Sequence, residues 1–177
     1  MISESHPLHR MFRGLTESTF MTELGVGDPT LVDYVSNLLA TFAPSRAHGR
    51  IRDKWGRPLL EVVEMLIEAE STDDEKRRAE CHQHVGDFTL FWTGVYPEAL
   101  RRPRGAESAD RLIDYQIQGK RSYYLAGALR PDDEERSVLL RLSEEFELCA
   151  YGLSQVRREW EKLEAEAAAG GAPTIWT

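Results

Sequence analysis

The sequence contains few cysteines and no long apolar run. Its two cysteines, Cys81 and Cys149, form no Cys-x-x-Cys spacing, and each lies within an apolar helical pattern. We therefore expect both thiols to be buried and reduced, as in a cytosolic protein. No stretch reaches the ~18 to 20 apolar residues of a membrane span, and the first residues lack the basic and apolar segments of a signal peptide. A cytoplasmic protein without a membrane partner is expected.

Positive charge is outnumbered by negative charge. The 177 residues include 22 Lys and Arg against 30 Asp and Glu, which gives a net charge of -8 at pH 7. An acidic chain has little general affinity for nucleic acid or anionic lipid. The sequence further lacks a glycine-rich phosphate loop, a Gly-x-Ser-x-Gly elbow and any Glu-x-x-His pair. These absences argue against nucleotide hydrolases, serine hydrolases and ferritin-type di-iron proteins, and no cofactor is expected.

What the sequence does contain is the pattern of a helical domain. Hydrophobic residues make up 41% and charged residues 29% of the chain, as in an ordinary soluble globular protein. Apolar residues recur at helical spacing along most of the chain. We predict an all-α, six-helix, bundle-like single domain over residues 1–164, with a long C-terminal helix, followed by a flexible C-terminal tail over residues 165–177.

Capping residues and helix breakers give the approximate helix bounds. The first predicted helix runs from Pro7 to Gly25, with a break at Gly14 left open, and the second runs from Pro29 to Pro44 and is capped by Asp28. The third runs from Leu59 to Ser71, and the fourth is capped by Thr72 and ends near Tyr96. The fifth is capped by Ser108 and reaches Leu129, and the sixth starts at Pro131. A loop with a hairpin-like excursion is predicted for residues 45–58, and a second loop for residues 101–105.

The last predicted helix carries an unbroken heptad seam. Its apolar residues follow one another in steps of three and four positions: Leu139, Leu142, Phe146, Cys149, Leu153, Val156, Trp160 and Leu163. Such a seam has to be buried, either inside the domain or against a second copy of the chain. Because a helix of ~50 Å is longer than the other helices can cover, we expect a homo-oligomer through the Leu139–Leu163 seam.

The stretch from Glu80 to Glu98 is unusual because it sorts into three helical stripes. One stripe is apolar. A second stripe of small and polar residues, where another helix can approach closely, consists of His82, Gly86, Thr89 and Thr93. The third stripe places His84 between Glu80 and Asp87, at i−4 and i+3. A helix with apolar and small faces on most sides is expected at the centre of the domain.

The third stripe permits a metal site or an enzymatic site. Glu80, His84 and Asp87 are possible metal ligands, but His82 points roughly 160° away from His84 and the chain has only five histidines. In an enzyme, His84 is a general base oriented by Asp87. The ligand-binding residues of that pocket are then Trp92, Tyr115, Arg121 and Tyr123. No nucleophile or substrate can be identified from the sequence.

The interpretation that the sequence favours is structural. His84 and Asp87 are then polar residues at a helix crossing, hydrogen-bonded to tyrosine hydroxyls or to an arginine of the fifth predicted helix. Two basic loops, residues 46–57 around Trp55 and residues 101–104, permit phosphate or nucleic-acid binding through charge and stacking. Their favoured role is to pair with the domain's own acidic residues, such as Glu61, Glu64 and Glu68.

One part of the sequence resembles a known family. The matching residues are an His-x-Gly-Asp-x-x-Leu-Phe-x-x-Gly-x-x-Pro-Glu signature from His84 to Glu98, Asp114-Tyr115, Gly119-Lys120, Tyr123 and Phe146-Glu-Leu-Cys149. With them the chain resembles a family of uncharacterised bacterial helical proteins, over Leu15 to Trp160. The resemblance implies an all-helical fold. It transfers no catalytic residue and no activity.

These observations favour one function over two others. The favoured function is a cytoplasmic helical binding or interaction module. The first alternative is a small-molecule or metal-dependent enzyme with a pocket around His84 and Asp87. The second is a phosphate or nucleic-acid binder that uses residues 46–57 and 101–104. The sequence does not decide whether the chain is an enzyme, and it weighs slightly against one.

Overall fold

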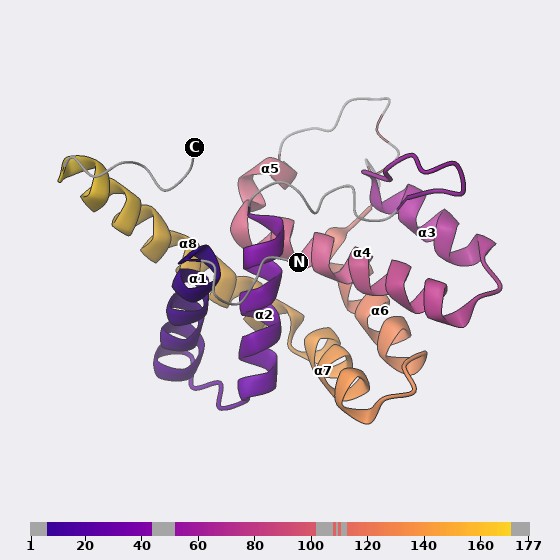
Figure 1. Cartoon of the computed structure of the whole chain (residues 1–177), viewed down its shortest axis with the longest axis horizontal. Coiled ribbons are helices and arrows are strands. Elements are labelled where there is room, and N and C mark those ends of the chain that lie inside the picture. The colour runs from indigo at the N-terminus through magenta and orange to yellow at the C-terminus, as the bar shows by residue number, and fades with distance from the viewer. Residues whose placement is uncertain (1–6, 44–51, 102–107, 109, 111–112, 171–177) are drawn as a thin grey trace.

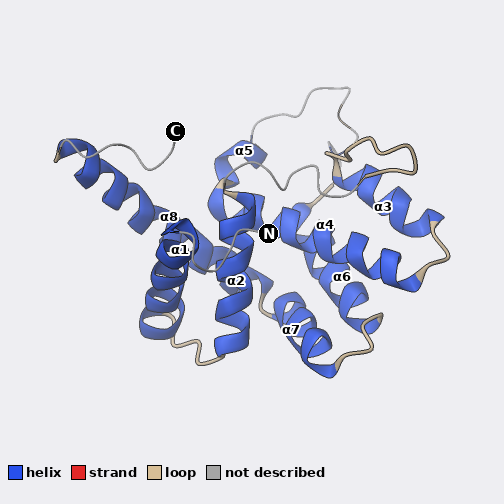
Figure 2. Ribbon diagram, viewed as in Figure 1, coloured by secondary structure: helices blue, strands red, loops and turns tan. Residues whose placement is uncertain are grey.

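A computed structural model describes residues 7–43, 52–101, 108, 110 and 113–170, which are mostly helical (Figures 1 and 2). Within these residues no strand forms, so the predicted all-α class is confirmed. The elements are α1 (Pro7–Glu17), the π-helix η1 (Ser18–Glu23), α2 (Pro29–Phe42), α3 (Val62–Ser71), α4 (Glu75–Val95), α5 (Pro97–Arg101), α6 (Tyr115–Ala128), α7 (Asp133–Glu144) and α8 (Phe146–Ala169).

The first two helices begin and end near the predicted residues. α1 passes through Gly14 without a break and continues into η1. Gly25 lies just after this helical run and has a φ of 68°. Glycine tolerates this left-handed conformation, so the chain can turn there. Asp28 caps α2 as predicted, and its carboxylate accepts a hydrogen bond from the backbone N–H of Thr30 at 2.9 Å. Pro29 then occupies the first turn.

Two of the predicted helix caps are wrong. α4 is capped by Asp74 instead of Thr72, because the Asp74 carboxylate accepts from the backbone N–H of Lys76 at 2.9 Å. α6 is capped by Asp114 instead of Ser108, so this helix begins later than predicted. In both places the chain offers more than one capping residue, and an aspartate caps at least as well as serine or threonine.

The long C-terminal helix is broken at Glu145, where φ is −102° and ψ is 24°. The heptad seam therefore runs over two helices, α7 and α8. Its residues from Leu139 to Trp160 are buried within the chain, whereas Leu163 is 45% exposed. α8 also extends to Ala169, into the predicted tail over residues 165–177. Self-association through the seam stays a prediction. Leu163 is the exposed seam residue that a second copy of the chain could contact.

α4 lies at the centre of the molecule and packs against α3, α6 and α8 (Figure 1). Glycines allow its close crossing with α6. A Cβ atom on Gly86 would lie 2.6 Å from the ring of Tyr123, and a Cβ atom on Gly119 would lie 2.4 Å from Thr89 Oγ1. The predicted small-residue stripe is therefore a close helix contact, and the predicted central position of this helix is confirmed.

α3 packs on α4 through one buried stripe and is capped from a distant part of the chain. The stripe consists of Val62, Met65 and Ala69. The carboxylate of Asp110 accepts hydrogen bonds from the backbone N–H groups of Val62 at 2.8 Å and Val63 at 2.9 Å. The hydroxyl of Tyr115, the first residue of α6, donates to the same carboxylate at 2.8 Å. Asp110 thereby fastens the start of α3 to the start of α6.

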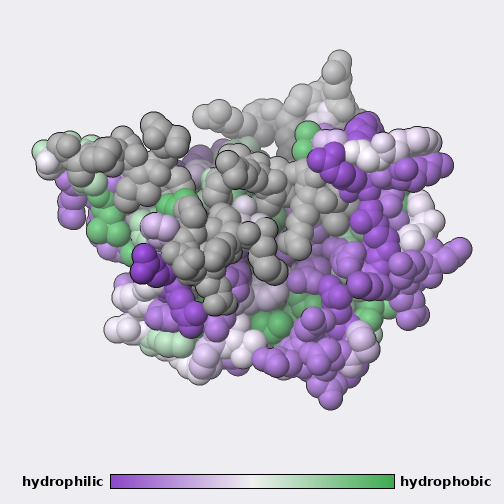
Figure 3. Space-filling view, viewed as in Figure 1, coloured by the Kyte–Doolittle hydropathy of each residue, from purple (hydrophilic) through white to green (hydrophobic). Residues whose placement is uncertain are grey.

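The described part of the face drawn in Figure 3 is largely hydrophilic. Figure 3 shows mostly hydrophilic residues over α3, α4 and α7, with small apolar patches between them. Across residues 7–43, 52–101 and 113–170, no helix combines the length and the apolar character that a membrane crossing requires. Isolated apolar residues at a protein surface are normal. An exposed apolar residue is informative only where it lies in a larger apolar patch or in a fixed binding geometry.

Candidate functional site

Asp87 lies where three helices meet and binds two phenols. Its side chain is buried. The hydroxyl of Tyr34 on α2 donates to Asp87 Oδ1 at 2.6 Å, and the hydroxyl of Tyr123 on α6 donates to the same oxygen at 2.8 Å. Gln83 Nε2 donates to the Tyr34 hydroxyl at 2.9 Å, and the Arg130 guanidinium donates to Gln83 Oε1. We call these five residues the Asp87 network.

The two phenols of the network stay neutral at physiological pH. Burial raises the pKa of Tyr34 and of Tyr123 well above the ordinary value, and the Asp87 carboxylate raises both further. Both hydroxyls are therefore protonated and donate to Asp87 over the whole neutral range. A satisfied network of this kind joins α2, α4 and α6 in one arrangement. This agrees with the structural interpretation of Asp87, whose partner Tyr123 belongs to the fifth predicted helix.

His84 lies in an aromatic layer of the core. Its side chain is 3% exposed. The imidazole stacks on Phe42 of α2, with ring centroids 5.7 Å apart and an interplanar angle of 25°, and Phe88 lies 6.4 Å away. A general base needs an approach path for its substrate. Among the described residues, the aromatic rings cover His84 and leave it almost no exposed surface for a substrate to approach.

The predicted metal stripe does not form a ligand cluster. Among the described residues, no three His, Cys, Asp or Glu side chains gather as a group that could hold a metal ion. Glu80 is only half-buried, whereas His84 is covered by aromatic rings and Asp87 binds two phenols. Metal ligands have to converge on one point, and helical spacing alone does not make these three converge.

The four candidate ligand-binding residues lie in different surroundings. Tyr123 belongs to the Asp87 network. Tyr115 donates its hydroxyl hydrogen bond to Asp110. Trp92 belongs to an aromatic row, with its ring 5.8 Å from that of Tyr96. Arg121 is exposed on α6. Trp92 and Tyr115 share Phe88 as a neighbour, at 6.3 and 6.1 Å between ring centroids, and ligand binding by the four residues stays a prediction.

Two important polar residues were missed in the sequence. Tyr34 is 53 positions away from Asp87, and Asp110 is 48 positions away from Val62, so no local pattern connects either pair. The sequence gives a weak signal for Tyr34. This residue lies among the apolar residues of α2 that face the core, and a buried tyrosine hydroxyl needs a hydrogen-bond partner. For Asp110, the only signal is the absence of a good capping residue directly before α3.

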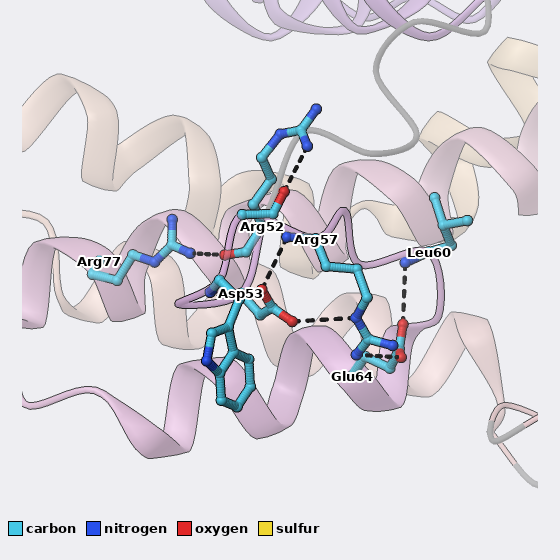
Figure 4. Close-up of polar contacts among 8 residues, drawn as sticks. Arg52, Asp53, Arg57, Leu60, Glu64 and Arg77 are labelled. Carbon is cyan, nitrogen blue, oxygen red and sulfur yellow. Dashed lines mark hydrogen bonds and ion pairs between the residues drawn. The ribbon is translucent and has the colours of Figure 1, made fainter.

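The described part of the first basic loop forms a small turn, residues 52–57, which we call the Trp55 turn (Figure 4). Arg52 and Pro58 form an isolated antiparallel bridge across its base. The predicted hairpin-like excursion is confirmed for these residues. Residues 46–51 of the same loop and residues 102–104 of the second basic loop lie outside the described residues.

Asp53 organises the Trp55 turn. Its Oδ1 accepts hydrogen bonds from the backbone N–H groups of Trp55 at 2.9 Å and Arg57 at 3.0 Å. Although burial acts to raise the pKa of Asp53, these two N–H groups and the Arg57 side chain lower it overall. Gly56 has a φ of 81°, a conformation that favours glycine. The turn is thus held by its own side chains.

Two arginines attach the Trp55 turn to the helices beside it (Figure 4). Arg57 pairs with Glu64 of α3 at 3.3 Å. Arg77 of α4 donates to the carbonyl oxygen of Arg52 at 2.5 Å and pairs with Glu68 of α3 at 3.1 Å. The predicted pairing between the basic loop and the acidic residues of this helix is confirmed for Arg57 and Glu64.

The turn holds an exposed indole next to one positive charge. Trp55 is 80% exposed, and the Lys54 ammonium lies 4.3 Å from its ring centroid. The Arg52 guanidinium donates to the carbonyl oxygen of Gly56 at 2.7 Å. Within the part of the chain that the structure describes, neither Lys54 nor Arg52 forms an ion pair. The Trp55 turn is the candidate functional site that the geometry supports.

Comparison with known proteins gives no relative. No protein-family model matches the chain, and no significant match is found among curated proteins or solved structures. The resemblance of residues 84–98 to a bacterial helical family therefore stays a prediction.

Proposed function

We propose that this chain is a protein interaction module that uses the Trp55 turn to bind an apolar, acidic surface of a partner protein. One observation supports this most: an 80% exposed indole stands on a turn whose backbone and side chains are fixed by hydrogen bonds. Tryptophan and arginine are enriched among the residues that dominate binding energy at protein interfaces. A fixed turn also loses little conformational entropy when it binds.

The charges of the turn favour an acidic partner surface. Lys54 lies beside the indole and Arg52 belongs to the same turn, and neither has an acidic partner among the described residues. A protein surface with a few acidic side chains complements these two charges. A long nucleic-acid strand fits less well, because it would also pass the acidic residues of α3 and of a chain whose net charge is -8.

The enzymatic alternative has less support. Asp87 Oδ1 is occupied by two phenols, and His84 is covered by aromatic rings. The proposed location is the cytoplasm. The two free, buried thiols of Cys81 and Cys149 support this location, because they need no oxidising compartment.

Peptide binding tests the proposed function. The probe is a short fluorescein-labelled peptide of leucine and glutamate, followed by fluorescence anisotropy at low salt. We expect the chain to bind it, and Trp55→Ala to weaken binding by more than about tenfold because the anchoring indole is lost. The matched control is Tyr151→Ala, which removes another exposed aromatic side chain, 55% exposed on α8. It should leave the affinity unchanged.

Other outcomes contradict the proposal. Equal affinities of Trp55→Ala and the wild-type chain would show that the indole is not the anchor. Equal binding of a leucine and lysine peptide would show that charge does not select the partner. Tighter binding of a labelled single-stranded oligonucleotide, with a steep loss on added salt, would assign the turn to nucleic acid instead. Circular dichroism of each variant confirms that the helices are retained.

A further inference from the structure

α3 carries a second apolar stripe that the described residues cover only in part: Val63 and Leu66 are half-buried, whereas Ile67 is exposed. A groove of about 310 Å³ runs along it, lined by Val63, Leu66, Ile67, Glu70 and Ser71. The buried stripe of the same helix already packs on α4, which is the main helix neighbour of α3 among the described elements. Ile67 is 62% exposed at the middle of the groove. This helix is therefore apolar on two sides, and the described residues bury one side fully and the other only in part.

The groove and the Trp55 turn are chemically complementary. The groove offers an apolar floor with Glu70, exposed on α3, at its rim. The turn offers an exposed indole with the Lys54 ammonium beside it. An indole needs an apolar surface to cover its faces, and an ammonium or guanidinium group needs a carboxylate. Each surface supplies what the other lacks.

We propose that the partner of the Trp55 turn is a second copy of this chain, whose α3 groove receives the indole. This inference rests on the proposed function and names the partner. Within one chain the contact is not made, since Trp55 remains 80% exposed. The turn is attached on the Glu64 and Glu68 side of α3, and the groove residues point roughly 120° away from that side on a 3.6-residue helix.

A two-fold axis allows both copies to make this contact at once. Because the turn and the groove both adjoin α3, each copy can place its Trp55 in the groove of the other, and the dimer closes with two equivalent contacts. Each indole buries at most about 250 Å², so the two anchors alone fall short of the ~1,000 Å² of a stable interface. We therefore expect a weak dimer that forms in the micromolar range.

Complementation of two defective variants tests the dimer. Sedimentation velocity over about 10 to 500 µM covers the expected affinity range. Trp55→Ala removes the indole, Ile67→Glu removes the apolar floor, and each alone should raise the dissociation constant by more than about tenfold. An equimolar mixture should associate more strongly than either variant, because one intact indole then meets one intact groove. Leu163→Glu, at the exposed end of the heptad seam, should dimerise like the wild-type chain.

Three outcomes would overturn this inference. The first is a monomer at all concentrations. The second is a dimer that Leu163→Glu disrupts and Trp55→Ala does not, which would place the interface on α8. The third is a mixture that associates no better than its components. If the chain stays monomeric but Trp55→Ala still weakens binding of the leucine and glutamate peptide, the interaction function holds and the partner is a different protein.

Discussion

At the scale of single residues, burial decides the charge state of His82. This histidine is 3% exposed on α4, and its Nδ1 has no hydrogen-bond partner within the described part of the chain. Burial lowers its pKa, and the charges of Arg121 on α6 and Arg78 on α4 lower it further, whereas Glu70 on α3 opposes them. His82 is therefore neutral at pH 7, between α3 and α6.

We predict a loss of stability in mild acid because of His82. Its pKa in the folded state lies below the unfolded value of 6.5, so the unfolded chain binds more protons. The contribution of His82 to the free energy of unfolding should be constant above pH 6.5 and fall as the pH drops below it, by at most about 1.4 kcal/mol per pH unit. Urea unfolding at several pH values measures this. His82→Gln should show a smaller decline between pH 7 and 5, and an identical decline would refute the assignment.

Single residues also show where sequence reasoning succeeds. Asp87 is predicted as a polar residue that bonds to a tyrosine of a neighbouring helix, because a buried carboxylate needs donors and Tyr123 is available. Tyr34 is not predictable in the same way, since its position beside Asp87 depends on how α2 crosses α4. His84 shows the opposite case. Its spacing from Asp87 indicates that the two side chains interact, but the imidazole stacks on Phe42 and lies in the aromatic layer.

At the scale of helices, the sequence predicts which segments are helical, but it does not predict where a long helix is interrupted. The heptad seam predicts one helix after Pro131, yet the chain breaks at Glu145 although no glycine or proline is present there. α7 packs mainly on α6, whereas α8 packs mainly on α4. Two helices that run in different directions can pack on α6 and α4 more closely than one straight helix could. Such a break is set by tertiary packing, which local spacing does not contain.

Two glycine variants test the close crossing of α4 and α6. Gly119→Ala should destabilise the fold by about 1 to 3 kcal/mol, because its Cβ atom would lie 2.4 Å from Thr89 Oγ1 and 2.5 Å from the ring of Phe146. Gly14→Ala is the matched control within α1, where no atom lies within 4 Å of the added Cβ. It should stabilise the fold by up to about 1 kcal/mol. Chemical denaturation measures both, and equal effects would contradict the crossing.

At the scale of the whole molecule, α4 and α8 belong to one hydrophobic core. Cys81 on α4 and Cys149 on α8 are both fully buried in that core. Burial raises the pKa of Cys81 to about 11 and that of Cys149 to about 12. At neutral pH both are protonated thiols, which react slowly because the thiolate is the nucleophile. Their reactivity therefore reports whether the core opens as one unit.

We predict that both thiols are protected until the molecule unfolds. In the native chain, 5,5′-dithiobis(2-nitrobenzoate) at pH 7.5 should label Cys81 and Cys149 at one common rate, which matches the rate of global unfolding. After denaturation both should react at once. Rapid labelling of one cysteine in the native chain would contradict a single cooperative core. Cys81→Ser and Cys149→Ser variants identify which helix opens.

Asp110 has a mechanical consequence for the whole molecule. Its carboxylate joins the first turn of α3, the helix that carries the groove, to Tyr115 at the start of α6. The ring of Tyr115 in turn lies 6.1 Å from that of Phe88 on α4. A load on α3 from a bound partner therefore passes through these contacts into the centre of the molecule. α3 is therefore held both at its first turn by Asp110 and along its buried stripe by α4, so a partner that binds it meets a helix that is fixed to the core.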